Sequence, residues 1–246
     1  MNDHKVPLPH VCALIPAFNE AERIAVTIAA LKMRPEITDI VVMDDGSTDG
    51  TAELAKNAGA TLVLTGRNGG KGAALGAAYA AARERAEIFL LVDADLGSSA
   101  GEAVKLLPPI FANEADMTIG MLPPDPQFAA SGQSGGRGLV VRLARWGIER
   151  RTQRVLAQPL SGQRAVRRSV LDALGGTFAA GFGVEVDLTV RALQAGFRVQ
   201  EVQTGFRHKV TGGDWPSLQH RARQFRDVAQ VVFSATSPGN KFPPSP

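Results

Sequence analysis

The chain has 246 residues, a hydrophobic content of 44%, a single cysteine and a formal net charge of +3 at pH 7. That length allows one large domain or two small ones, and no apolar run approaches the roughly 20 residues of a membrane-spanning helix. The lone Cys12 cannot form an internal disulfide, and its apolar surroundings predict a small buried side chain. The first ten residues lack the apolar core of a signal peptide, so we expect a cytoplasmic protein.

The charge is unevenly distributed along the chain. Residues 1–136 contain 10 Lys and Arg against 17 Asp and Glu, whereas residues 137–246 contain 17 against 7. The second half is therefore basic. Nucleic acid, an anionic membrane surface or a phosphorylated substrate could each use such a surface.

Apolar strands alternate with helices in the first half. We expect strands at 11–16, 39–45, 61–65, 87–95 and 116–122, and helices at 20–32, 48–59 and 70–86. Strands that are apolar throughout and separated by helices predict a parallel sheet covered on both faces, that is, a doubly wound α/β fold. Ligands of such sheets bind at the carboxyl ends of the strands.

The second half begins with a segment rich in Pro, Gly and Ser, residues 123–138, which predicts a mobile loop. It is either a lid over a ligand or a plain surface linker. Beyond it we expect helices at 139–157, 181–196 and 215–233, and two short strands within 197–209. The segment 160–174 is expected to turn into a short helix that begins near Ser169. We interpret residues 11–233 as one domain, with 11–122 as one half and 139–233 as the other, between tails at 1–10 and 234–246.

The expected helix at 139–157 carries five arginines and a set of apolar residues. The arginines are Arg142, Arg145, Arg150, Arg151 and Arg154. The pattern is typical of a solvated helix with one apolar side, and equally of a basic amphipathic surface for a membrane or a phosphate-bearing acceptor.

Three polar pairs follow directly after expected strands. Asn19 and Glu20 follow the first strand, Asp44 and Asp45 end the second, and Asp93 and Asp95 end the fourth. Random placement would not put all three at strand ends. The carboxyl edge of the sheet is therefore the predicted site.

Asp93 and Asp95 are two residues apart, so in an extended segment they project to the same side. Two such carboxylates repel each other unless a cation lies between them, and hard oxygen ligands suit Mg²⁺ or Mn²⁺. The alternative is a pair of aspartates that only cap a helix or shape a loop.

Two further features suggest a nucleotide. A carboxylate at Asp44 or Asp45 can accept hydrogen bonds from a ribose or a base. In "NGGKG" (68–72), Lys71 stands at a glycine-flanked helix start, where backbone amides and an ammonium favour a phosphate. Taken alone, Lys71 would be read as a surface lysine.

The segments "ALIPAFNEAERI", "VVMDDGSTDGT", "GGKGAALGAAY" and "LVDADL" occur in this order. Together they resemble the family 2 glycosyltransferases, which have a GT-A fold and use nucleotide-sugar donors. In the second half, "SGQRAVRRSVL", "GFGVEVDL" and "EVQTGFRHKVTGGDW" are similar to the polyprenyl (dolichyl) phosphate sugar synthases and to glucosyl-3-phosphoglycerate synthase. The resemblance covers most of residues 11–230.

This resemblance implies roles for individual residues. Asp93, Asp95 and His208 are the implied metal ligands, for Mg²⁺ or Mn²⁺, and Asp95, Glu185 and His208 are the implied catalytic residues. The implied donor-binding set is Pro16, Ala17, Asn19, Glu20, Asp44, Asp45, Gly70, Lys71, Asp93 and Ala94.

One departure from the family bears on the acceptor. Many family 2 enzymes carry an acidic pair that deprotonates a sugar hydroxyl, and the nearest residues here are Glu185 and Asp187. A phosphate is already ionised near neutral pH and needs no base, so we expect a phosphorylated acceptor. The implied acceptor-binding residues are Gln163, Arg164 and Arg167, with Arg168 as a further candidate.

We therefore expect a metal-dependent hexosyltransferase. The resemblance implies a UDP-sugar donor, such as UDP-glucose, and a polyprenyl phosphate or a small phospho-acid as acceptor. One alternative is a sugar nucleotidyltransferase, although "IPAFNE" is not the glycine-rich loop of those enzymes. The other is a non-catalytic protein of the same fold that binds nucleotides or nucleic acid. Few aromatics and no recognition motif argue against nucleic acid. Peripheral contact with the inner face of a membrane and a homodimer are left open.

Overall fold

The structure, a computed structural model, describes residues 9–123, 137–207, 226–230 and 232–233. One seven-stranded sheet runs through this part of the chain, in the order β3-β2-β1-β4-β6-β5-β7. The strands are β1 (Val11–Ala17), β2 (Asp39–Asp44), β3 (Leu62–Thr65), β4 (Ile88–Leu91), β5 (Met117–Met121), β6 (Arg164–Arg167) and β7 (Val199–Gln203). Only β6 runs antiparallel to its neighbours, β4 and β5.

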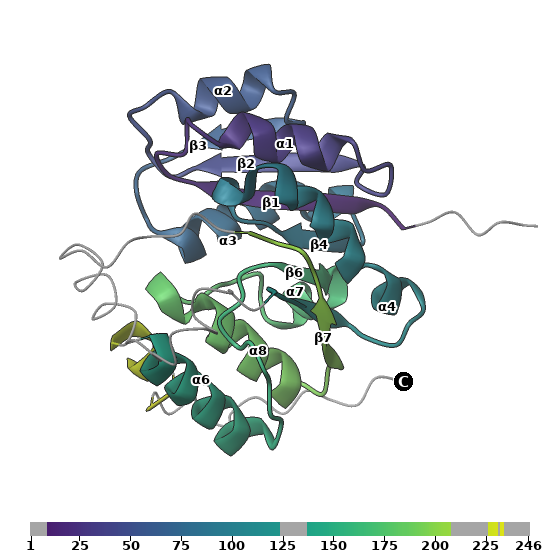
Figure 1. The fold of residues 1–246 in the computed structure, drawn as a ribbon, viewed down its shortest axis with the longest axis vertical. Helices are drawn as coiled ribbons and strands as arrows, with labels where there is room; N and C mark the ends of the chain where they lie inside the picture. The colour runs from purple at the N-terminus through teal and green to yellow at the C-terminus, as the bar shows by residue number, and fades with distance from the viewer. Residues whose placement is uncertain (1–8, 124–136, 208–225, 231, 234–246) are drawn as a thin grey trace, which may run out of the picture.

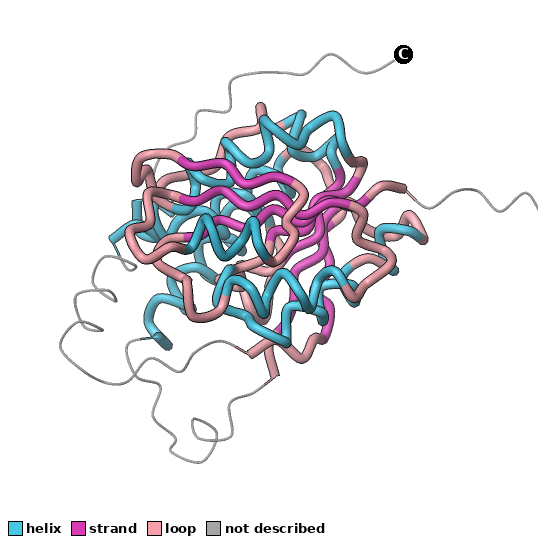
Figure 2. Tube along the Cα trace, turned by 90° about the horizontal axis from the view of Figure 1, so that it is seen from above, coloured by secondary structure: helices cyan, strands magenta, loops and turns pink. Residues whose placement is uncertain are grey.

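Helices cover both faces of the sheet, as Figure 2 shows from above. They are α1 (Ile24–Lys32), α2 (Thr51–Asn57), α3 (Lys71–Ala82), α4 (Pro108–Phe111), α6 (Arg137–Thr152), α7 (Arg168–Ala173) and α8 (Val184–Gln194). Short 3-10 segments complete the set: η1 (Arg83–Arg85), η2 (Ala94–Leu106) and η3 (Gly181–Gly183). In Figure 1, α1 and α2 lie at one end of the molecule and α6 and α8 at the other.

The alternation of side chains in β1 explains why both faces are covered. Val11, Ala13 and Ile15 pack into one apolar cluster with α1 and η2. Cys12 and Leu14 point the other way, into a cluster with α3, α6 and α8. The predicted doubly wound α/β class is therefore confirmed. Cys12 is fully buried, and burial, followed by the charge of Asp39, raises its pKa to about 12.

The second half of the chain differs from the sequence prediction in one important element. Residues 164–167 form a strand that was not predicted, β6, between β4 and β5, and residues 168–173 form the short helix expected near Ser169. The buried Ala165 and Val166 fill the sheet interior, which a four-residue pattern cannot distinguish from a helix face. Of two strands expected within 197–209, the described residues 197–207 contain one, β7.

Several expectations concern residues that the structure does not describe. These are His208, the tails at 1–8 and 234–246, residues 124–136 of the expected loop, and 208–225 and 231 of the last segment. Residues 226–230 are helical, as predicted, and Val228 is buried. Over the described part of the chain, none of the helices combines the length and the apolar character needed to cross a bilayer.

Candidate active site

The carboxyl ends of β1, β2 and β4 meet at one edge of the sheet, and the turns that follow them are joined by hydrogen bonds. Asn19, which has a left-handed φ of 55°, accepts the Thr48 amide on its Oδ1 at 3.0 Å. Its own amide donates to Ser47 Oγ at 2.9 Å, and the Glu20 amide donates to Thr51 Oγ1 at 2.9 Å. The turn after β1 is therefore fixed against the turn after β2.

Asp44 and Asp45 are both buried and both hold backbone in place. Asp45 accepts the amides of Gly69 and Gly70, each at 2.8 Å, one on each carboxylate oxygen. Asp44 Oδ1 accepts the amide of Ser47 at 3.0 Å and also its hydroxyl. Asp45 thus shapes the glycine loop that precedes Lys71. Contact of either carboxylate with a ribose or base stays a prediction.

Lys71, at the start of α3, lies at the centre of a cluster built from four separate segments. Its Nζ is 2.7 Å from Asp93 Oδ1 and 2.8 Å from Glu185 Oε1. Gln163 Nε2 donates to the other Asp93 oxygen at 2.6 Å. Burial alone would lower the pKa of Lys71, but the carboxylates of Asp93 and then Glu185 outweigh it and raise that pKa above its usual value. The ammonium is therefore a fixed positive charge.

Glycine makes room for this cluster. A Cβ on Gly162 would lie 2.7 Å from Lys71 Nζ and 2.8 Å from Asp93 Oδ2. A Cβ on Gly72 would lie 2.0 Å from the carbonyl oxygen of Ala179, where α3 meets the segment before α8. Sequence reasoning did not single out either glycine, because the partners are far away along the chain.

The structure distinguishes the two acidic residues of "GVEVD". Glu185 is 9% exposed and points to Lys71, whereas Asp187 forms an ion pair with Arg191, 3.2 Å away on the same helix. The Lys71–Glu185 pair spans 114 positions of sequence. No local pattern could have found it, although a carboxylate within the buried stripe of Val184, Val186 and Leu188 is an unusual placement that signals a partner.

Asp93 and Asp95 do not lie in a strand, so the expectation that strand alternation places them on one side is corrected. β4 ends at Leu91, Asp93 is the extended residue before η2, and Asp95 is in the first turn of η2. Asp93 faces Lys71 and Gln163, and the carbonyl of Asp95 accepts Arg23 Nη1 at 3.1 Å. The Asp93 carboxylate is thus engaged by Lys71 and Gln163, whereas Arg23 holds the backbone of Asp95.

The donor chemistry of this edge fits a hard divalent cation. Among the described residues no three His, Cys, Asp or Glu side chains converge on one point, and His208 lies outside that set. A cation such as Mg²⁺ commonly takes only one or two carboxylates and completes its shell with water and substrate phosphates. A site based on Asp95 fits that pattern.

Arg164 does not face the site, which corrects its assignment to the acceptor. Its side chain is 1% exposed and donates to Thr189 Oγ1 at 2.7 Å and to the Ser161 carbonyl at 3.1 Å. Burial lowers its pKa to about 10. Arg164 therefore joins β6 to α8 inside the protein, whereas its neighbour Gln163 reaches the cluster.

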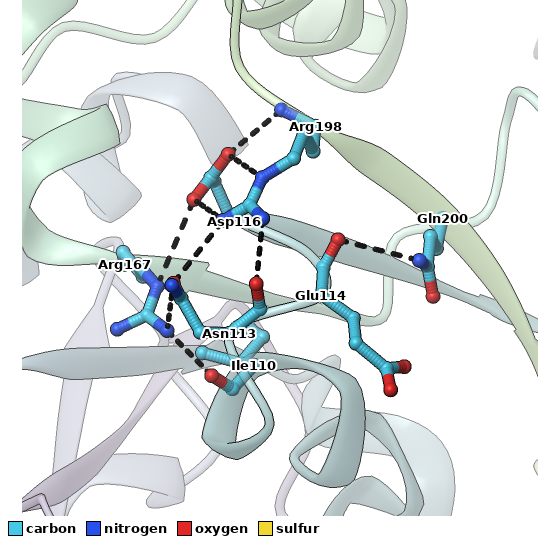
Figure 3. A network of polar contacts seen from close by, with 7 residues as sticks. All are labelled: Ile110, Asn113, Glu114, Asp116, Arg167, Arg198 and Gln200. Atoms are coloured by element: carbon cyan, nitrogen blue, oxygen red, sulfur yellow. Dashed lines mark hydrogen bonds and ion pairs between the residues drawn. The ribbon is translucent and has the colours of Figure 1, made fainter.

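Arg167 lies at the opposite edge of the sheet, which corrects its assignment too. It pairs in register with Ile88 at the start of β4, whereas Arg164 pairs with Leu91 at the end. Its Nη2 donates to Asn113 Oδ1 at 3.3 Å, and its Nε is 3.8 Å from Asp116 Oδ1 (Figure 3). Arg168 is at that edge as well, 3.6 Å from Glu84. Arg167 and Arg198 share Asp116 and so join the starts of β5 and β7 to β6, and neither Arg167 nor Arg168 can contact an acceptor at the carboxyl edge.

A surface cavity that sequence reasoning missed opens beside the turn that carries Asp95. Arg23, Ser98, Ser99 and Arg207 contribute to its lining. The Arg207 amide donates to Ser99 Oγ at 3.1 Å, which fixes the chain after β7 against η2. Arg23 and Arg207, from distant segments, thus line one cavity beside the turn that carries Asp95.

Comparison with known proteins is consistent with this geometry. Residues 12–175 match the protein family described as glycosyl transferase family 2. The chain is 34% identical over 218 residues to glycosyltransferase AglJ of Haloferax volcanii, an alignment that covers 85% of this chain and 67% of AglJ. It is 30% identical over 220 residues to polyprenol monophosphomannose synthase of Mycolicibacterium smegmatis, covering 84% and 80%.

Among solved structures, glucosyl-3-phosphoglycerate synthase from Mycobacterium tuberculosis, in complex with Mn²⁺, uridine diphosphate and phosphoglyceric acid, is similar to this chain. The TM-score is 0.75 at 25% identity, and the match covers 92% of this chain and 78% of that one.

Proposed function

The chain belongs to glycosyl transferase family 2 and is a glycosyltransferase with a GT-A fold, and we propose that it transfers a hexosyl group from a UDP-sugar to a phosphorylated acceptor with the help of Mg²⁺ or Mn²⁺. The observation that carries this proposal is the cluster of Lys71, Asp93, Gln163 and Glu185 at the carboxyl edge of the sheet. Membership of this family favours a glycosyltransferase over a sugar nucleotidyltransferase and over a non-catalytic protein of the same fold.

Lys71 is the group that we assign to the donor pyrophosphate. Its side chain is 30% exposed, stands at the amino end of the 12-residue helix α3, and is held charged by two carboxylates. Backbone amides at a helix start and a fixed ammonium both favour a phosphate. The turn at Asn19–Glu20 and the turn at Asp44–Ser47 lie at the same edge of the sheet as Lys71 and would bind the nucleoside.

Asp95 is the residue that we assign to the cation, with Asp93 beside it and His208 as a further ligand. A bound Mg²⁺ or Mn²⁺ would neutralise charge that develops on the departing diphosphate. His208 lies outside the described residues, and its assignment rests on the resemblance of "EVQTGFRHKVTGGDW" to the family. Solved relatives contain Mn²⁺ or Mg²⁺ with uridine diphosphate.

The surroundings of Glu185 support a phosphorylated acceptor. Its carboxylate is engaged by Lys71, and Asp187 is paired with Arg191, so neither is placed as a base for a sugar hydroxyl. A phosphate needs no such base, and Arg23 and Arg207 supply cationic groups beside Asp95. The names of two relatives refer to phosphate compounds: one is a polyprenol monophosphomannose synthase and the other a glucosyl-3-phosphoglycerate synthase.

The exposed side of α6 supports peripheral contact with a membrane, which a polyprenyl phosphate acceptor would require. Leu139 and Trp146 are 61% and 45% exposed and share this side with Arg142 and Arg150. The Arg150 guanidinium lies 5.7 Å from the centroid of the Trp146 ring. Phe233 packs against the same Trp146 ring, with 5.7 Å between the two ring centroids. Aromatic and arginine side chains on one helix side are typical of interfacial helices.

A thermal-shift panel tests the donor site first. We would measure unfolding with UDP, GDP, ADP, CDP and dTDP, each with and without Mn²⁺ or Mg²⁺. The expected result is a metal-dependent stabilisation by UDP, about 2.7 kcal/mol at roughly 100 times the dissociation constant. Stabilisation by another nucleotide instead would mean that the donor carries that nucleotide and not UDP. Absence of stabilisation by all five nucleotides would overturn the proposal. Transfer from the matching nucleotide sugar to polyprenyl phosphate or to 3-phosphoglycerate then distinguishes the acceptors.

A further inference from the structure

One fully buried hydroxyl on α1 bridges the turn that carries Asp95. Thr27 Oγ1 donates to the Ala94 carbonyl at 2.7 Å and accepts the Gly97 amide at 2.9 Å. Four residues earlier on the same side of α1, Arg23 donates to the Asp95 carbonyl at 3.1 Å. Helix α1 thus binds three backbone groups within four consecutive residues of the turn.

These bonds replace those that a regular helix would supply. Gly97 has φ of 55° and ψ of −137°, which interrupts the helical path of η2. A residue with a side chain rarely adopts that conformation, so glycine is required. At such an interruption the neighbouring amide and carbonyl lose their helical partners, and the Thr27 hydroxyl satisfies one of each.

We propose that Thr27 is a positioning residue that fixes the direction in which the Asp95 carboxylate leaves the turn, and thereby sets affinity for the divalent cation. This inference rests on the proposed metal-dependent function. A ligand carboxylate must be held closely in place, and loss of a group that supports a metal ligand commonly costs 10- to 100-fold in metal affinity. Thr27 itself touches neither metal nor substrate in this proposal.

The competing explanation is that Thr27 only fastens α1 to η2. The chain offers a matched control in Thr118, which is also fully buried and whose Oγ1 donates to the Leu106 carbonyl at 2.8 Å. Leu106 is the last residue of η2, at the end remote from Asp95. Thr118→Val therefore removes the same kind of bond from the same segment without disturbing the turn.

The experiment compares Thr27→Val, Thr27→Ser and Thr118→Val. We expect Thr27→Val to raise the Mn²⁺ concentration for half-maximal UDP-dependent thermal stabilisation by about tenfold or more. Thr27→Ser should restore the wild-type value, and Thr118→Val should keep it. In the metal-free protein, hydrogen exchange at the Gly97 amide should accelerate in Thr27→Val alone.

A second pair of variants keeps the test valid if Thr27→Val does not fold. Gly97→Ala strains the turn although a Cβ there meets no atom within 4 Å, and Gly196→Ala strains an equally open site at φ of 86°, after α8. The metal requirement should rise in the first variant and not in the second.

The outcomes separate the two proposals. Wild-type metal dependence in folded Thr27→Val or Gly97→Ala, or an equal change in Thr118→Val or Gly196→Ala, overturns the role of Thr27 alone. If the wild-type protein itself shows no metal-dependent nucleotide binding, the proposed function fails and this inference fails with it.

Discussion

Lys71 Nζ lies 2.7 Å from Asp93 Oδ1, although Lys71 is in the first turn of α3 and Asp93 lies between β4 and η2. Glu185 completes the contact from α8, at 2.8 Å. One ammonium therefore compensates two carboxylates and still keeps 30% of its side chain exposed. This relationship explains how a positive charge can be held in an acidic half of the chain and presented to a diphosphate.

The first prediction concerns Lys71→Met. Removing the ammonium leaves Asp93 and Glu185 without their shared partner, so we expect weaker UDP binding and at least about 10²-fold slower transfer, a typical loss for one electrostatic group. We also expect lower stability at pH 7. Against the effect of burial, Asp93 and Glu185 raise the pKa of Lys71, so its contribution to stability is present below the unfolded value of about 10.4, and the stability deficit should shrink only as the pH rises through the folded value.

Urea unfolding at several pH values and UDP titration measure these effects. Lys105→Met is the control, because Lys105 forms an ion pair with Glu102 at 2.7 Å but is 54% exposed. It should change stability by less than about 1 kcal/mol and leave UDP binding unchanged. Equal effects of the two variants would mean that Lys71 is an ordinary surface lysine.

The second prediction concerns the network of Figure 3, in which Arg198 Nε and Nη2 donate to the two oxygens of Asp116 at 3.0 and 2.9 Å. These hydrogen bonds, chiefly from Arg198, lower the pKa of Asp116. A lowered folded-state pKa contributes stability above the unfolded value of about 3.9, and this contribution is lost as the pH falls through the folded value. Asp116→Asn should therefore cost about 1–2 kcal/mol at pH 7 and less at pH 3.

Unfolding of the wild type and Asp116→Asn at both pH values provides the measurement. Because the network is at the edge opposite Lys71, UDP binding should not change. A stability loss that is the same at pH 7 and pH 3 would show that the carboxylate charge of Asp116 contributes nothing.

The sequence predicted the site best where a feature was local. Each polar pair at a strand end, and Lys71 at its helix start, could be placed from its immediate neighbours, because parallel strands bring their carboxyl ends to one edge. The contacts of Lys71 with Glu185 and of Thr27 with the Asp95 turn connect segments 114 and about 70 residues apart. Such pairs depend on how helices pack across the sheet, which periodicity does not encode.

Arg164 and Arg167 show why the acceptor prediction failed at those positions. In "RAVR" two arginines flank two small apolar residues, a pattern too short to distinguish a helix from a strand. As strand β6, the segment buries Arg164 against Thr189 and carries Arg167 to the opposite edge of the sheet.

The third prediction therefore places the binding site for the acceptor phosphate in the cavity beside the turn that carries Asp95. Arg207 lines that cavity and is exposed, so Arg207→Met should fold normally. We expect the KM for the phosphorylated acceptor to rise about tenfold or more, since a charged hydrogen bond is worth about 1.5–3 kcal/mol, with little change in the KM for the donor. Arg167→Met is the matched control and should leave both KM values unchanged. A rise in acceptor KM for Arg167→Met only would reverse this assignment.

The last prediction concerns the exposed side of α6. Trp146 and Phe233 are 45% and 66% exposed and pack together, while Arg142 and Arg150 flank them with positive charge. Burial of two aromatic rings at a lipid interface, and attraction of about 1 kcal/mol per arginine to anionic lipid, should together give measurable binding. The wild type should therefore sediment with vesicles of equimolar phosphatidylglycerol and phosphatidylcholine.

The charge and aromatic contributions can be separated by two variants. Arg142→Glu should reduce binding most strongly at low salt, because surface electrostatic attraction is screened by ions. Trp146→Ala should reduce it at all salt concentrations. Met33→Ala is the control, since Met33 is 81% exposed at the end of α1 and belongs to neither group. If Met33→Ala weakens sedimentation as much as Trp146→Ala, or if the wild type does not sediment at low salt, α6 is a solvated helix and a water-soluble phospho-acid becomes the favoured acceptor.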